Sequence, residues 1–319
     1  VLSFFKNISA YERCIAHYNS EVYVFSELNE KSLALAQSLC RNNGKRFFVF
    51  TDVFEREEQS DRLAERAKKL GAVCFKKDIV SVDFSFHSKK SKLVFFVIGE
   101  DQSKNVGQAL KIVERLKYRE NTDLYVFSSQ IEAEMLLSGA FGGDGSDIRI
   151  RVRRVNEVQS LIMRNLYENG FEKIFKSAYD DGTGVKKINA VVVGMGQHGT
   201  EMTKALSWFC QMNGYLVEIN SFDLSESAED KFISECPELM KLSGKTDIAD
   251  EARYTIRIHS GVNADGAAFD TLISSLPRTT YAFVALGNDE KNISAAIKLR
   301  VLFERMNYNP EIQAVVYNS

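Results

Sequence analysis

The chain repeats one pattern of strands and helices in its two halves. Residues 93–101 form a continuous apolar run that ends in Gly-x-Asp, and residues 281–289 repeat this arrangement. A Lys-Asn pair soon follows each run, at Lys104-Asn105 and at Lys291-Asn292, and a helical pattern comes next. Continuous apolar runs are typical of strands buried on both faces of a parallel sheet. The repeat therefore predicts two α/β domains of the same kind, one after the other.

The segments on either side of these runs correspond as well. In the first copy we expect strands at 22–25, 47–50, 72–75 and 124–127, with helices at 31–40, 60–70 and 106–116. In the second copy we expect strands at 190–193, 215–222, 254–258 and 312–316, with helices at 200–212 and 293–303. Strands that alternate with helices form mainly parallel sheets with right-handed crossovers. We therefore predict two tandem Rossmann-like domains, residues 1–155 and 188–319, joined by a linker helix and loop at 156–187.

Charge and cysteine content argue against several classes of protein. The formal net charge of −2 gives no electrostatic reason to expect DNA, RNA or an anionic membrane as the main partner. The 5 cysteines are far apart and form no Cys-x-x-Cys motif, which favours reduced thiols in the cytoplasm over a structural zinc site. No stretch approaches the roughly 18 apolar residues that span a bilayer. Because the chain begins at Val1 inside an apolar stretch, we interpret it as a fragment of a longer polypeptide.

The second copy carries a glycine-rich loop between a strand and a helix. The loop follows the β-branched strand 188–193 and leads into a helical pattern at Thr200, and its sequence is Gly194-Met195-Gly196-Gln197-His198-Gly199. In a dinucleotide-binding loop the first glycine permits a tight turn, the second lets the backbone approach a pyrophosphate, and the third lets the helix pack closely on the strand. The helix N-terminus directs N–H groups and a positive dipole end at the phosphates. We therefore predict that this loop binds NAD(H) or another adenine nucleotide.

Other residues of the second copy complete the predicted site. Asp223 ends the second strand about where a carboxylate binds the ribose of NAD, and an acid there disfavours the 2′-phosphate of NADP. Gly287 and Asn288 are expected to line the crevice from the fourth strand. His259 and Ser260 are candidates for contacts to the adenine edge.

The first copy lacks a glycine loop. Its first strand is followed by the segment Ser26-Glu27-Leu28-Asn29-Glu30, whose two glutamates place carboxylates where a pyrophosphate needs N–H donors. Ser26 or Asn29 is expected to cap the following helix instead. We predict that this domain has lost ordinary dinucleotide binding and has a structural or dimerising role.

Two further features lie between the copies. The Gly-rich segment 139–145 has no helix directly after it, so we interpret it as a surface loop and not as a phosphate cradle. Arg149, Arg151 and Arg153 alternate along the next strand. We interpret this alternation as a solvated sheet edge that carries charge.

The second copy resembles the RCK/KTN domains, the nucleotide-binding regulatory modules of bacterial potassium transporters and channels. The resemblance rests on the loop 194–199, on Asp223 and on the segment 284–293, which looks like the family's fourth strand and the Asp-Glu-x-Asn start of its next helix. It covers the second copy well and, with an altered loop, most of the first. It implies binding of NAD(H) or an adenine nucleotide, pairing through helices that flank the sheet, and transmission of the ligand state to an attached membrane or effector domain.

These features predict a regulatory nucleotide sensor. The 4 histidines form no recognisable motif with a carboxylate, and His198 is expected to face solvent or the cofactor edge. We predict no catalytic and no metal-binding residue. The alternatives are an NAD-dependent oxidoreductase and a Rossmann-like receptor for a cyclic nucleotide signal. The expected partners are the nucleotide, a second copy or the other domain of the same chain, and a membrane domain outside this fragment.

Overall fold

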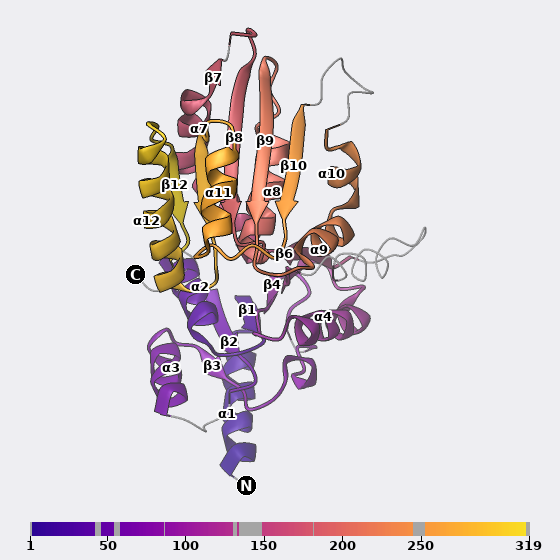
Figure 1. Cartoon of the computed structure of the whole chain (residues 1–319). Helices are drawn as coiled ribbons and strands as arrows, with labels where there is room; N and C mark the ends of the chain where they lie inside the picture. The colour runs from indigo at the N-terminus through magenta and orange to yellow at the C-terminus, as the bar shows by residue number, and fades with distance from the viewer. Residues whose placement is uncertain are drawn as a thin grey trace. The chain divides into compact units, whose positions relative to one another are not determined.

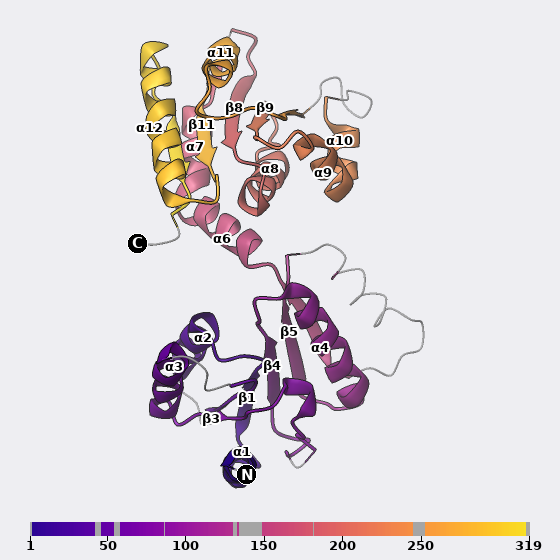
Figure 2. The same cartoon turned by 60° about the horizontal axis from the view of Figure 1, so that its bottom comes forward.

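The chain forms two compact units. The computed structural model describes residues 2–41, 46–53, 58–85, 87–129, 133, 149–180, 182–244 and 253–316. The first unit comprises residues 1–157 and the second residues 158–319. Figure 1 shows the whole chain, and Figure 2 shows it from a second direction. Each unit holds a mainly parallel sheet between helices, which confirms the predicted fold class.

A six-stranded parallel sheet organises the first unit. Its strands lie in the order β3-β2-β1-β4-β5-β6, which is the order of a complete Rossmann sheet. They are β1 (Glu21–Phe25), β2 (Arg46–Phe50), β3 (Val73–Cys74), β4 (Leu93–Val97), β5 (Thr122–Phe127) and β6 (Arg151–Val155). The described helices include α1 (Leu2–Ala16), α2 (Glu30–Arg41), α3 (Glu58–Lys69) and α4 (Gln102–Leu116).

Helices cover both faces of this sheet. α1 and α4 contribute to the apolar cluster on one face, and α2 and α3 contribute to the cluster on the other. Figure 2 shows α2 and α3 on the opposite side of the sheet from α4. Every residue of β4 is buried, as expected for a central strand between two layers of helices. On the α2 face the ring of Phe25 stacks between those of Phe50 and Phe96, with centroids 4.9 and 5.0 Å away.

The second unit repeats this strand order. Strands β10-β9-β8-β11-β12 run parallel, and the short β7 pairs antiparallel with β8. The strands are β7 (Tyr179–Asp180), β8 (Lys186–Val193), β9 (Tyr215–Phe222), β10 (Tyr254–His259), β11 (Tyr281–Val284) and β12 (Glu311–Ala314). The described helices include α6 (Glu157–Asn165), α7 (Phe171–Ser177), α8 (Gln197–Phe209), α9 (Ala228–Glu235), α10 (Pro237–Leu242), α11 (Ala267–Ser275) and α12 (Asp289–Arg305). Helices α6 to α10 pack on one face of the sheet, and α11 and α12 pack on the other (Figure 1).

The segment between the two copies packs into the second unit. Ile162 and Leu166 lie four residues apart on one helical face, and Ile174 follows in α7. All three side chains are at most 2% exposed and belong to the core of the second unit. Apolar residues at this spacing form a stripe that a helix buries against its neighbours. Residues 158–177 are therefore a part of the second unit and not a free linker.

Three helices begin earlier than their apolar patterns indicate. α4 begins at Gln102, α8 at Gln197 and α12 at Asp289, whereas the patterns begin at 106, 200 and 293. Asp101 caps α4 and Asn288 caps α12, each through a side-chain oxygen that accepts backbone N–H groups. Polar residues fill much of the first turn after a cap, so the apolar periodicity starts later than the helix itself.

The arginine-bearing strand β6 lies at an edge of the first sheet, as predicted. Arg151 Nε donates to Asp123 Oδ1 at 2.7 Å, and the Arg153 guanidinium lies over the ring of Tyr125, 5.9 Å from its centroid. The Gly-rich segment 139–145 falls outside the described residues. Among the helices that the structure describes, none has the length and apolar character needed to cross a membrane.

Candidate functional site

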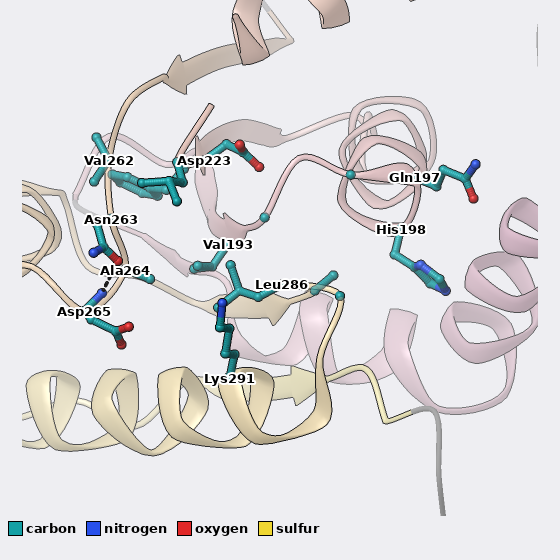
Figure 3. A pocket seen from close by; sticks show the side chains of 16 residues that line it. Val193, Gln197, His198, Asp223, Val262, Asn263, Ala264, Asp265, Leu286 and Lys291 are labelled. Atoms are coloured by element: carbon teal, nitrogen blue, oxygen red, sulfur yellow. Dashed lines mark hydrogen bonds between the residues drawn. The ribbon is translucent and has the colours of Figure 1, made fainter. Parts of the chain in front are cut away.

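A cavity of about 570 Å³ opens at the carboxyl ends of strands in the second unit. It is lined by Val193 and Gly194, by residues 196–198, 222–224, 262–265 and 285–287, and by Lys291. β8 lies between β9 and β11, so the chain crosses to one side of β8 and then to the other. Ligands of parallel α/β sheets bind at such a switch point, outside the carboxyl ends of the strands. Figure 3 shows this cavity from close by.

Two glycines of the loop are required by the backbone itself. Gly194 has a φ of +93°, and a Cβ there would lie 2.3 Å from the carbonyl oxygen of Ala285. A Cβ at Gly199 would lie 1.7 Å from the carbonyl oxygen of Gly194. These contacts bring the loop against β11 and the first turn of α8 against the loop. Both glycines are therefore needed for the fold, whatever the cavity binds.

Gly196 is different, because a Cβ at this position would meet no atom within 4 Å. Gly196 nevertheless lines the cavity and is the N-cap residue of α8, where no side chain caps the helix. The bare backbone at Gly196 and the positive end of the α8 dipole thus border the same open space. Figure 3 shows the Gln197 and His198 side chains projecting away from Val193 and Asp223. Burial holds the pKa of His198 below its ordinary value.

Asp223 lies directly after β9 and is held by two backbone groups. The N–H of Met195 donates to its Oδ2 at 2.6 Å, and the N–H of Ser225 donates to its Oδ1 at 2.7 Å. A carboxylate offers about four lone-pair sites, so each oxygen retains acceptor capacity toward the cavity. The hydroxyl groups of a ribose are donors of the kind that such oxygens accept.

A loop after β10 completes the wall on the side of Asp223. Val262 donates its backbone N–H to the carbonyl oxygen of Asp223 at 2.8 Å. The ammonium of Lys298, in α12, donates to the carbonyl oxygen of Ala264 at 2.9 Å. The N–H of Asp265 donates to Asn263 Oδ1 at 3.0 Å, as the dashed line in Figure 3 marks. These bonds fix residues 262–265 at the rim of the cavity.

The structure brings together most, but not all, of the residues predicted from the sequence. Those that line the cavity are Gly194, Gly196, Gln197, His198, Asp223 and Gly287. Met195 reaches the site through its backbone, and its side chain packs against the core instead. Gly199 lies behind the loop, where it allows the close approach of the helix.

Three predicted residues do not line the cavity themselves. The ring of His259 stacks on that of Phe222, with centroids 4.5 Å apart and planes 12° apart. Ser260 Oγ accepts the backbone N–H of Glu229 at 3.1 Å. Asn288 Oδ1 accepts the backbone N–H of Lys291 at 3.2 Å. The polar atoms of Ser260 and Asn288 thus serve helix starts, and His259 covers a core residue.

Sequence reasoning missed residues 262–265, Leu224, Leu286 and Lys291, which also line the cavity. Residues 262–265 lie in an irregular loop, so no periodic pattern in the sequence marks them. Lys291 had a signal in the sequence, because it belongs to the Lys-Asn pair that occurs in both copies.

At the corresponding strand ends of the first unit, charged side chains of the protein contact one another. The ammonium of Lys104 donates to Glu27 Oε1 at 3.1 Å and to Asp52 Oδ2 at 2.9 Å. Asn29 caps α2, since its Oδ1 accepts the N–H of Ser32 at 2.8 Å. The cap agrees with the prediction that a polar side chain, and not a glycine loop, starts this helix.

Comparison with models of known protein families found no match, and neither did comparison with curated protein sequences.

Proposed function

We propose that the second unit binds NAD(H) or another adenine nucleotide in the cavity above β8 and β9, as a regulatory sensor. The observation that carries the proposal is the environment of Gly196. Its Cβ position is open, it borders a cavity of about 570 Å³, and it caps α8. The packing of the chain does not require a glycine there, whereas the close approach of a pyrophosphate does.

The cavity offers a partner for each part of such a ligand. The pyrophosphate lies over Gly196 at the start of α8. The ribose hydroxyls donate to Asp223, whose negative charge disfavours the 2′-phosphate of NADP. Leu224, Val262 and Ala264 supply apolar surface for the adenine.

The regulatory role is supported by the resemblance to RCK/KTN domains on the loop 194–199, Asp223 and the segment 284–293. In this proposal the unit passes its ligand state to an attached membrane or effector domain.

Two alternative functions make different predictions. An oxidoreductase converts NAD(H) when a substrate is added, and a cyclic-nucleotide receptor prefers a cyclic nucleotide to NAD(H). Absorbance at the nicotinamide band and competition between ligands separate these three functions.

The test is calorimetric titration of NAD, NADH, NADP, ADP and ATP into the wild-type chain and into Gly196→Leu. The leucine side chain projects into the open space where we place the pyrophosphate, so affinity should fall at least about 100-fold at an unchanged folding stability. Gly107→Leu is the matched control, because a Cβ at Gly107, in α4 of the first unit, also meets no atom within 4 Å. This control should bind as the wild type does.

Two outcomes contradict the proposal. One is a wild-type chain that binds none of the five nucleotides. The other is a Gly196→Leu variant that binds them with unchanged affinity, since the phosphate then lies elsewhere.

We also propose that two copies of the chain pair through α12 of the second unit. Ile293, Ile297 and Val301 lie four residues apart on α12 and are 48%, 60% and 40% exposed. Residues at this spacing form one stripe on a helix, and two such stripes pair across a twofold axis. Light scattering should show a dimer of the wild type that Ile297→Glu converts into a monomer. A wild-type monomer at high concentration contradicts this part.

A further inference from the structure

Lys104 and Lys291 occupy the same position in the two units. Each is the third residue of its helix, α4 after β4 in the first unit and α12 after β11 in the second. The cap residue of each helix accepts the backbone N–H of the lysine, from Lys104 to Asp101 Oδ1 at 3.1 Å and from Lys291 to Asn288 Oδ1 at 3.2 Å. The first turns of α4 and α12 therefore present the two lysines in the same way.

The asparagines that follow confirm this equivalence. Asn105 Nδ2 donates to the carbonyl oxygen of Phe127, the last residue of β5, at 2.8 Å. Asn292 Nδ2 donates to the carbonyl oxygen of Val315 at 2.8 Å, just after β12. Each amide oxygen accepts an N–H of the loop that precedes its helix, from Gly99 in the first unit and from Leu286 in the second. Both helices are thus fixed to their sheets by the same bonds.

The side chain of Lys104 shows where a lysine at this position reaches. Its ammonium contacts Glu27, in the loop after β1, and Asp52, in the loop after β2. The Glu27 and Asp52 side chains are 24% and 18% exposed, so this triad is partly buried. The hydrogen bond to Asp52, together with that to Glu27, holds the pKa of Lys104 above its ordinary value. The strand ends of the first unit therefore hold an ammonium that is neutralised by carboxylates of the same chain.

The second unit lacks the carboxylate that corresponds to Glu27. Glu27 is the second residue after β1, and the second residue after β8 is Met195. Lys291 lines the cavity, and within the described part of the chain its ammonium belongs to no ion pair. Figure 3 shows its side chain extending from α12 toward Leu286. The second unit thus presents a cation to the cavity that pairs with no carboxylate of the described residues, although Asp223 and Asp265 line the same cavity.

We propose that Lys291 binds a phosphate group of the ligand, and that Glu27 takes the place of this phosphate inside the first unit. This inference rests on the proposed function of the second unit and names the charged group of the ligand that the cavity recognises. A phosphate oxygen accepts a charge-assisted hydrogen bond from an ammonium, as the carboxylate of Glu27 does from Lys104. The carboxylates of Glu27 and Asp52 also repel an anionic ligand from the first unit, so each chain binds one nucleotide.

The experiment is titration of inorganic pyrophosphate, ADP and NAD into the wild type, Lys291→Met and Lys291→Arg. Loss of the ammonium should weaken the binding of all three ligands about three- to ten-fold, because solvent screens the charge of the exposed Lys291. Lys291→Arg should stay within about two-fold of the wild type, because it keeps the charge. Lys104→Met is the matched control and should leave the affinity of each ligand unchanged. The stoichiometry should be one ligand per chain.

Thermal unfolding followed by the fluorescence of Trp208, the only tryptophan of the chain, shows that the Lys291 variants fold. Trp208 lies in the second unit, so circular dichroism is used for Lys104→Met. Wild-type affinity of Lys291→Met for pyrophosphate and nucleotides overturns the inference, and so does a second ligand bound by the first unit. If pyrophosphate binds through Lys291 while ADP and NAD do not bind, the inference holds and the proposed function fails. If none of the three ligands binds the wild type, both fail.

Discussion

The backbone N–H of Met195 donates to Asp223 Oδ2 at 2.6 Å, so the carboxylate after β9 holds the glycine loop after β8. The second oxygen accepts the N–H of Ser225 at 2.7 Å. One side chain therefore positions the loop and offers acceptors to the cavity. A substitution of Asp223 affects both properties, and an experiment on this residue has to measure both.

Asp223→Ala should lower the free energy of unfolding of the second unit by about 1–3 kcal/mol, because two partly buried N–H groups lose their acceptor. It should also weaken adenine nucleotides about ten-fold or more through the lost ribose contacts. Urea unfolding followed by Trp208 fluorescence measures the first effect, and calorimetry measures the second. Asp265→Ala removes a carboxylate from the same cavity. As a control it should change the stability by less than about 0.5 kcal/mol.

Gly199→Ala should destabilise the second unit by more than about 3 kcal/mol, because its Cβ would lie 1.7 Å from the carbonyl oxygen of Gly194. Gly196→Ala should change the stability by less than about 1 kcal/mol, since its Cβ would meet no atom within 4 Å. Urea unfolding of the two variants is the measurement. Equal stabilities would contradict the packing of the loop against α8.

Lys104→Met should destabilise the first unit by about 1 kcal/mol, because Glu27 and Asp52 then face each other without a cation. The effect is small because solvent screens the ion pairs of Lys104, whose side chain is 37% exposed. Adding Glu27→Gln to this variant should restore most of the lost stability, since one of the two like charges is removed. Hydrogen exchange of the β1 and β4 amides reports on this unit. Additive effects of the two substitutions would show that the triad is not coupled.

His87 should make the stability of the first unit depend on pH. Its Nδ1 accepts a hydrogen bond from Arg119 Nη2 at 2.8 Å, and its Nε2 lies 2.8 Å from the carbonyl oxygen of Ser20. Arginine is always a donor, so Nε2 carries the proton in the folded protein. Burial, and then the charge of Arg119, holds the pKa of His87 below its ordinary value of 6.5.

Below about pH 6.5, His87 therefore binds a proton in the unfolded chain while it stays neutral in the folded protein. The free energy of unfolding should be unaffected by His87 above pH 6.5 and should fall as the pH drops below it. The slope is at most about 1.4 kcal/mol per pH unit for one proton. Denaturant unfolding of the wild type and His87→Gln between pH 8 and pH 5 measures it. An equally steep decline in His87→Gln would assign the effect to other groups.

Much of the fold follows from local signals in the sequence. The strand predicted at 215–222 has the same first and last residues as β9. The repeated Gly-x-Asp and Lys-Asn positions mark β4 and α4 in the first unit and β11 and α12 in the second. Periodicity, caps and glycine loops act over a few neighbouring residues, so a single sequence carries them. The cavity wall at 262–265 has no such signal, because it is an irregular loop held by bonds to Asp223 and Lys298.

The sequence by itself determined two α/β copies, a glycine loop in the second and an acidic segment in its place in the first. Only the tertiary structure decided what the shared lysine contacts, because Glu27 and Asp52 lie in two separate loops and Lys104 lies in the first turn of α4. It also placed His259 against Phe222 and Ser260 against Glu229, and neither His259 nor Ser260 lines the cavity. The physical reason is that side chains at the ends of parallel strands meet only when the sheet has formed, and their distances depend on its packing.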